Sequence, residues 1–112
     1  MLFRSPALGT CTAVTAGTAF SAALRIGGTV FAWGDNSSGQ CNVPAGLGTV
    51  AAISANGAGN HLAALLTDGS VRCWGRNVEG QCNVPGALGA CSMVAAGGVH
   101  TLALREIGRA HV

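Results

Sequence analysis

The chain has 112 residues, of which 9% are charged, and its formal net charge of +2 is carried by six arginines and no lysine. No apolar run approaches the roughly 18 residues that cross a bilayer, which excludes a membrane-spanning helix. The few, scattered positive charges argue against binding to nucleic acid or to an anionic membrane. The first residues lack the long apolar core of a signal peptide, which leaves the compartment open and favours the cytoplasm.

The first predicted hairpin joins a strand ending at Leu24 to a strand beginning at Thr29, across a glycine turn at Gly27–Gly28. Glycine makes up 18 of the 112 residues and no ten-residue stretch has helical spacing, which argues against helices. Because side chains alternate between the faces of a strand, Trp33 lies on the face opposite to Val30. The same alternation gathers three side chains on one face, namely Phe20, Ala22 and Leu24.

The segment that follows, residues 33–44, returns almost unchanged at residues 74–85. Nine of the twelve positions are identical, in the pattern Trp-Gly-x-Asn-x-x-Gly-Gln-Cys-Asn-Val-Pro. A repeat of this size indicates an array of one supersecondary unit. The Gly-Gln-Cys-Asn-Val-Pro part is predicted to carry the chain into the next unit, because proline ends strand pairing.

The second unit repeats the hairpin with a stronger turn signal. Strands over His61–Leu65 and Ser70–Trp74 flank Asp68–Gly69, a pair typical of hairpin turns in which both residues take positive φ. The loop at Asn56–Asn60 is two residues longer than its counterpart in the first unit, which marks it as a surface loop.

A third, partial unit aligns residues 94–104 with residues 14–24. The sequence therefore predicts an all-β fold in a single repeat array over 1–112, with units at about 8–46, 47–87 and 88–106 and three to four strands in each. Residues 107–112 depart from the repeat and resemble a translated sequencing adapter, so we expect an artefactual tail on a fragment of a longer chain.

The shared pattern Gly-x-Val-x-x-Trp-Gly-x-Asn-x-x-Gly-Gln-x-x-Val-Pro resembles the regulator of chromosome condensation repeat, from about Pro6 to Leu104. It is most similar to the short-unit type found in propeller-type β-lactamase inhibitory proteins. The resemblance implies a partial β-propeller of about two and a half short blades. It also implies a protein-binding scaffold without catalytic activity. The alternative that the family offers is a guanine nucleotide exchange factor for a small GTPase, as part of a longer chain.

A closed propeller needs about four to eight blades, so a chain of fewer than three leaves two flat blade faces open. If each face left about 400 Å² of apolar surface in water, roughly 25 cal/mol/Å² makes the lost burial about 10 kcal/mol per face. That loss equals the whole stability of a typical domain. We therefore expect the chain alone to be marginally stable, to aggregate or to associate with copies of itself.

The five cysteines are interpreted as small buried apolar side chains. No Cys-x-x-Cys pair favours a zinc site. Equivalent cysteines, such as Cys41 and Cys82, would lie on sheets about 10 Å apart, which is too far for a disulfide. A complete disulfide framework remains an alternative, although it would leave one thiol over.

No catalytic, metal or cofactor site is predicted. His61 and His100 share their repeat position with Phe20, so that position accepts a ring without a titratable nitrogen and favours a structural or surface role. Trp33 and Trp74 recur regularly, which favours wedges between blades over exposed platforms for sugars or bases.

The predicted binding surface consists of the loops before the second strand of each unit. These loops recur at one end of every blade and form a row, as in other repeat proteins that bind partners. Loops at 35–38 and 76–79 supply a second, more polar row. The predicted partner is a protein, and the candidate contact residues are Thr18, Phe20, Asn60, His61, Val99 and His100.

Overall fold

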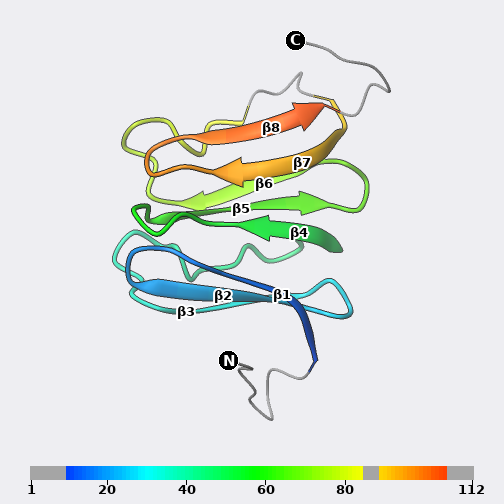
Figure 1. The fold of residues 1–112 in the computed structure, drawn as a ribbon, viewed down its shortest axis with the longest axis horizontal. Coiled ribbons are helices and arrows are strands. Elements are labelled where there is room, and N and C mark those ends of the chain that lie inside the picture. Colours follow the sequence, from blue (N-terminus) through cyan, green and yellow to red (C-terminus); the bar gives the residue numbers. More distant parts are fainter. Residues whose placement is uncertain (1–9, 85–88, 106–112) are drawn as a thin grey trace.

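The computed structural model describes residues 10–84 and 89–105, so the predicted tail at 107–112 and the unit boundary near 87 lie outside the described residues. The described chain forms three antiparallel sheets stacked one on another (Figure 1). The first sheet contains β1 (Cys11–Ala16), β2 (Phe20–Arg25) and β3 (Val30–Gly34). The second contains β4 (Val50–Ser54), β5 (His61–Leu66) and β6 (Val71–Gly75). The third contains β7 (Cys91–Ala96) and β8 (Thr101–Arg105).

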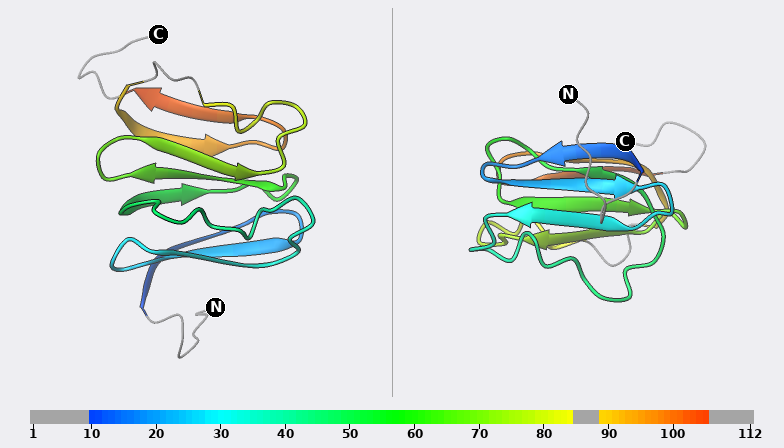
Figure 2. Two further views of the ribbon diagram at one scale, coloured as in Figure 1. Left: turned by 180° about the vertical axis from the view of Figure 1, so that it is seen from behind. Right: turned by 90° about the horizontal axis from the view of Figure 1, so that it is seen from below.

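Each sheet corresponds to one repeat unit, and the strands follow one another in chain order across it. Figure 2 shows the three sheets lying face against face, as propeller blades do. The prediction of about two and a half all-β blades is confirmed by two sheets of three strands and one of two. No helix among the described residues has the length and apolar character needed to cross a membrane.

The β2–β3 and β5–β6 hairpins turn through three-residue loops of the same kind. In the second sheet, Leu66 N–H donates to the Ser70 carbonyl at 2.8 Å and Gly69 N–H donates to the Leu66 carbonyl at 2.9 Å. Gly69 has a φ of 90°, but no described non-glycine residue has a positive φ, so the prediction of positive φ at Asp68 is wrong. A type I turn followed by one left-handed glycine fits the strand twist equally well. The Asp68 carboxylate accepts the Ser70 N–H, which lowers the pKa of Asp68.

The core lies between the sheets. The predicted face of β2 points at the second sheet, where Leu62 and Ala64 of β5 pack against it. A smaller cluster joins Leu65 and Val71 to Cys91 of the third sheet. Strand β5 is therefore buried on both faces, because a sheet covers each of them. Strand β8 is mostly exposed, since no described sheet covers its outer face.

Backbone hydrogen bonds repeat at each blade junction. The first strand residue of one blade donates its N–H to the turn glycine of the blade before it: Val50 to Gly28 at 3.0 Å and Cys91 to Gly69 at 2.8 Å. A hydroxyl also accepts an N–H across each junction: Thr15 from Ala55 and Ser54 from Ala96, both at 3.0 Å. These bonds set the register between blades, and the conformation of each turn glycine is part of that register.

The connector is the segment after each tryptophan that leads into the next blade. A network of side-chain hydrogen bonds explains why its sequence is repeated. The Asn36 amide accepts the Cys41 N–H at 2.8 Å and donates to Asn42 at 2.9 Å. The buried Gln40 side chain accepts the Ser38 N–H at 2.8 Å. The second copy repeats these bonds at distances between 2.7 and 2.9 Å, at Asn77, Glu79, Gln81, Cys82 and Asn83. Positions 38 and 79 contribute a backbone N–H to these shared bonds, which explains why their side chains vary.

The interpretation of all five cysteines as apolar fillers is wrong for two of them. Cys73 and Cys82 form a disulfide, with their Cα atoms 5.0 Å apart. Both lie within the second unit, and Cys73 stands where the first unit has Ala32, so Cys41 has no equivalent partner. Cys91 is buried, as predicted.

Replacing Cys82 by alanine is expected to lower the free energy of unfolding by about 2–3 kcal/mol, because the disulfide closes a loop of about ten residues. Cys41→Ala is the matched control, since it removes the equivalent thiol without breaking a disulfide. Urea denaturation without reductant measures both. A reductant should lower the stability of the wild type by the same amount and leave the stability of Cys82→Ala unchanged. Equal effects of Cys82→Ala and Cys41→Ala would contradict the disulfide between Cys73 and Cys82.

Candidate protein-binding surface

The three loops predicted to form a row lie together at the left-hand end of the sheets in Figure 1. We call residues 17–19, 56–60 and 97–100 the loop row. Thr18 joins the first two loops, since its N–H donates to the Gly59 carbonyl at 2.9 Å and its hydroxyl to the Gly57 carbonyl at 3.2 Å. Gly59 packs so closely on the third loop that a Cβ there would lie 3.0 Å from the Gly97 carbonyl oxygen. The row is therefore continuous across all three blades.

The structure exposes only part of the predicted contact set. Thr18 and His100 are exposed and Asn60 is half-buried. Phe20 and His61, by contrast, are 3% and 0% exposed, which corrects the expectation that their rings lie on the surface. Each begins the second strand of its blade and faces the next blade, which covers it. The equivalent His100 is exposed because no described blade covers its face.

His61 acts as a link between blades. Its Nε2 lies 3.1 Å from the His100 carbonyl oxygen, and because a carbonyl only accepts, Nε2 carries the proton and donates. Its Nδ1 is buried without a hydrogen-bond partner among the described residues. Burial lowers the pKa of His61, while the hydrogen bond to His100 opposes that shift. The ring is therefore uncharged and has a structural role, which is one of the two roles that the shared repeat position with Phe20 favoured.

Substituting phenylalanine for His61 is expected to flatten the pH dependence of stability. The folded-state pKa of His61 lies below its ordinary value of 6.5, so in acid the unfolded chain binds the proton first and stability falls as the pH drops below about 6.5. The limiting slope is about 1.4 kcal/mol per pH unit. Phe20 shows that a phenyl ring suits this repeat position, so stability at pH 7.5 should change by no more than about 1.5 kcal/mol.

Urea unfolding between pH 7.5 and 5 measures this effect. His100→Phe is the matched comparison: its backbone carbonyl can still accept from His61 Nε2, and because the His100 charge is the last of the three causes that set the pKa of His61, it should reduce the pH dependence less than His61→Phe does. An undiminished slope in His61→Phe would show that another group causes the acid sensitivity.

A charged rim flanks the loop row at the same end of the blades. Asp35 N–H donates to the Ala19 carbonyl and Arg76 N–H to the Asn60 carbonyl, each at 2.9 Å, which holds the connector loops against the row. On the rim, Arg76 and Glu79 form an exposed ion pair at 3.1 Å that lowers the pKa of Glu79. The loop row itself contains no Asp, Glu, Lys or Arg. An uncharged centre with a charged rim is typical of protein-binding surfaces.

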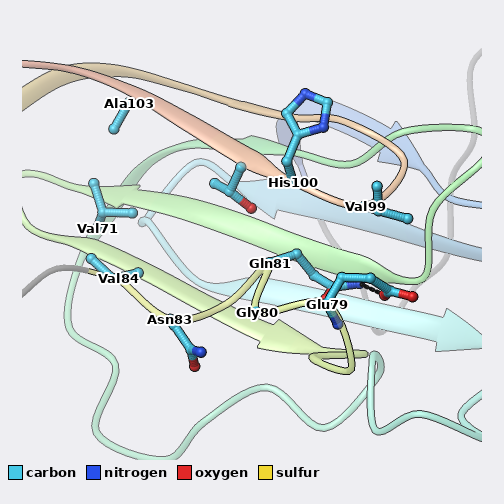
Figure 3. A pocket seen from close by; sticks show the side chains of 10 residues that line it. Val71, Glu79, Gly80, Gln81, Asn83, Val84, Val99, His100 and Ala103 are labelled. Carbon is cyan, nitrogen blue, oxygen red and sulfur yellow. Dashed lines mark hydrogen bonds between the residues drawn. The ribbon is translucent and has the colours of Figure 1, made fainter.

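The ionisable side chains in residues 10–84 and 89–105 do not assemble into a metal centre. No three His, Cys, Asp or Glu side chains in those ranges lie close enough together to hold a metal ion. One further feature escaped the sequence-based predictions: a cavity beside β8, partly lined by Gln81 and Thr101 (Figure 3). Gln81 and Thr101 align with Gln40 and Leu62, which stand one repeat earlier at the junction of the first two blades. Repeat alignment therefore places this cavity at the junction of the second and third blades.

The sequence and the fold both match known proteins. The family model described as regulator of chromosome condensation (RCC1) repeat matches residues 11–40 and 50–81. The structure is similar to human WBSCR16 at 20% identity and a TM-score of 0.79, over 92% of this chain and 33% of that one. It is also similar to the ectodomain of the Physcomitrella patens receptor kinase CR4, at 27% identity and a TM-score of 0.71, over 87% and 26%.

A third similar structure is Prp20p from Saccharomyces cerevisiae, at 18% identity and a TM-score of 0.74, over 88% of this chain and 32% of that one. The chain thus spans about a quarter to a third of the length of these proteins. No curated protein sequence matches it significantly. Since the family model covers more than half of the residues and the stacked sheets have the propeller fold, the chain belongs to the regulator of chromosome condensation (RCC1) repeat family.

Proposed function

We propose that the chain is a protein-binding scaffold that recognises its partner through the loop row and has no catalytic activity of its own. The continuity of the loop row across three blades carries this proposal. Hydrogen bonds and close packing hold the loops in place before a partner arrives, which reduces the entropy lost on binding. Proteins of the same fold support a protein as the partner: Kap60 has been crystallised bound to yeast RCC1 (Prp20), and Prp20p has binding properties to Gsp1p and histones.

The test compares substitutions at the two ends of the blades. Val99 is 54% exposed in the loop row, whereas Ile26 is exposed in a hairpin turn at the opposite end. Immobilised wild-type chain, Val99→Asp and Ile26→Asp are used to capture proteins from the source cells, and bound proteins are quantified by mass spectrometry. We expect a partner retained by the wild type and Ile26→Asp and reduced at least tenfold by Val99→Asp. Capture that is indifferent to Val99→Asp but lost with Ile26→Asp would refute the loop row as the binding surface.

A second measurement addresses nucleotide exchange. The release of a fluorescent guanine nucleotide from a panel of small GTPases is followed with and without the full chain. The scaffold proposal expects no acceleration, and acceleration would replace it with the exchange function.

The open blade faces support self-association as a further property. On the outer face of the third sheet, Met93, Leu102 and Leu104 are more than half exposed, and Val14 is exposed on the outer face of the first sheet. Exposed apolar patches of this kind favour association. We expect the sedimentation-velocity mass to rise with concentration, and Leu102→Lys combined with Leu104→Lys to reverse the rise. A constant monomer mass in the wild type would contradict this expectation.

A further inference from the structure

The loop before β5 contains Asn56–Gly57, the only place in the sequence where glycine follows asparagine. The loop turns through residues 56–59, where the Gly59 N–H donates to the Asn56 carbonyl at 2.8 Å. Asn56 is half-buried and Gly57 is exposed, so water reaches the pair. A Cβ at Gly57 would meet no atom within 4 Å, so the backbone around its nitrogen is not crowded. A glycine nitrogen in open surroundings is the least hindered nucleophile that a backbone offers.

The hydrogen bonds of this loop prepare the Asn56 side chain for attack by the Gly57 nitrogen. The Asn56 Oδ1 accepts the Ala58 N–H at 2.9 Å, which makes an Asx turn. The ring of atoms that this turn closes includes the Gly57 nitrogen. A donor aimed at a carbonyl oxygen also stabilises the negative charge that develops there when a nucleophile adds. The Gly57 N–H donates to no acceptor in residues 10–84 and 89–105, so solvent can remove its proton.

The asparagines of the connectors are held differently. The Asn36 side chain accepts the Cys41 N–H at 2.8 Å and donates through Nδ2 to Asn42 at 2.9 Å. Asn77 makes the same two bonds in the second unit. Both ends of these two amides are occupied, so the loss of ammonia from either would break a hydrogen bond. Each is also followed by a residue with a side chain, which crowds the attacking nitrogen. The fold therefore protects Asn36 and Asn77 and leaves Asn56 reactive.

We propose that Asn56–Gly57 is a self-modification site, at which the side-chain amide of Asn56 is lost as ammonia in the folded chain. The Gly57 nitrogen gives up its proton and attacks the Asn56 Cγ. A bond forms between these two atoms, the bond from Cγ to Nδ2 breaks, and ammonia leaves with the proton. Water then opens the resulting succinimide ring at one of its two carbonyl groups, which gives aspartate or isoaspartate. The chain and water supply every atom, and no atom is oxidised or reduced.

Either product changes the loop row. The loop row contains no Asp, Glu, Lys or Arg, so the reaction introduces its first charged side chain. Isoaspartate also lengthens the main chain by one methylene group between residues 56 and 57. Thr18 binds this stretch through its N–H to the Gly59 carbonyl at 2.9 Å and its hydroxyl to the Gly57 carbonyl at 3.2 Å. Isoaspartate should therefore loosen the contact between the first two loops. The reaction itself does not depend on the proposed function.

The experiment incubates the full chain in mildly alkaline buffer, digests it in acid and follows each asparagine by peptide mass spectrometry. An isoaspartyl methyltransferase detects the isoaspartate. We expect Asn56 to convert at least tenfold faster than Asn36 and Asn77. Its rate in the folded chain should stay within tenfold of the rate in guanidinium chloride, because the loop leaves the Gly57 nitrogen free to react. A slower rate than that in the folded chain, or equal rates at the three asparagines, would overturn the proposal.

Two glycine substitutions identify the nucleophile. Gly57→Ala has room for its Cβ in the loop and should slow the conversion of Asn56 at least tenfold, because the added methyl group hinders attack by the nitrogen. Gly27→Ala is the matched control: its Cβ also meets no atom within 4 Å, but it lies in the turn at the opposite end of the blades. It should leave the rate unchanged. Equal rates in Gly57→Ala and the wild type would refute attack by this nitrogen.

Amide hydrogen exchange measures the effect on the loop row. The modified chain is purified by ion exchange through its added charge and compared with Asn56→Asp, which has the charge without the longer main chain. Exchange at Thr18 should be at least tenfold faster in the isoaspartyl chain than in Asn56→Asp. The Val50 amide, which donates to Gly28 at the other end of the same junction, should not change. Equal exchange at Thr18 in the two chains would refute the loosened contact.

Discussion

Replacing Trp74 by alanine is expected to lower the free energy of unfolding by about 3–5 kcal/mol, the usual loss for a large buried aromatic side chain. Trp74 is 8% exposed and lies between the first two blades, where its indole N–H donates to the Gln40 carbonyl. Truncation would leave a cavity in the main core cluster and remove the donor from that carbonyl. Chemical denaturation followed by circular dichroism measures the loss.

Trp33 provides the matched control within the same chain. It occupies the same repeat position but is 38% exposed, so Trp33→Ala should destabilise by no more than half as much. Trp74→Phe should fall between the wild type and Trp74→Ala, because a phenyl ring fills part of the space without donating a hydrogen bond. Equal losses for Trp33→Ala and Trp74→Ala would contradict a role that depends on the neighbouring blade.

Introducing alanine at Gly75 is expected to destabilise the fold by roughly 2–6 kcal/mol, from backbone strain and overpacking together. The φ of Gly75 is 112°, a conformation that side chains with a Cβ rarely adopt. An added Cβ would lie 2.6 Å from the Asn60 carbonyl oxygen and 2.8 Å from the His61 Cα. Gly34 has the same conformation in the first blade, with a φ of 111°, which explains why glycine follows both tryptophans.

Gly57→Ala is the control for this prediction. A Cβ at Gly57 would meet no atom within 4 Å, and its φ lies outside the region that disfavours a side chain. Its effect on stability should therefore stay within about 0.5 kcal/mol. Urea denaturation of the two variants is sufficient, and comparable losses in both would refute the close approach at Gly75.

The cysteines and the hairpin turns show how far local sequence can be interpreted. The hairpins occur where the glycines indicated, but the φ of Asp68 was predicted wrongly because two turn types suit Asp-Gly equally well. The Cys73–Cys82 disulfide was not predicted because repeat alignment compares equivalent positions on different blades. A contact between non-equivalent residues of one blade depends on how the connector folds back over its own sheet.

Periodicity along the chain was enough to determine the repeat unit, the strands, the alternation of their faces and the connector. Each of these depends on neighbours within about forty residues, so local sequence carries the information. The stacking of blades decided the rest. Phe20, His61 and His100 share one repeat position, yet two are buried and one is exposed. Trp33 and Trp74 differ for the same reason. Whether a blade face is covered depends on the sheet beside it, and residues that match within the repeat do not have matching neighbours.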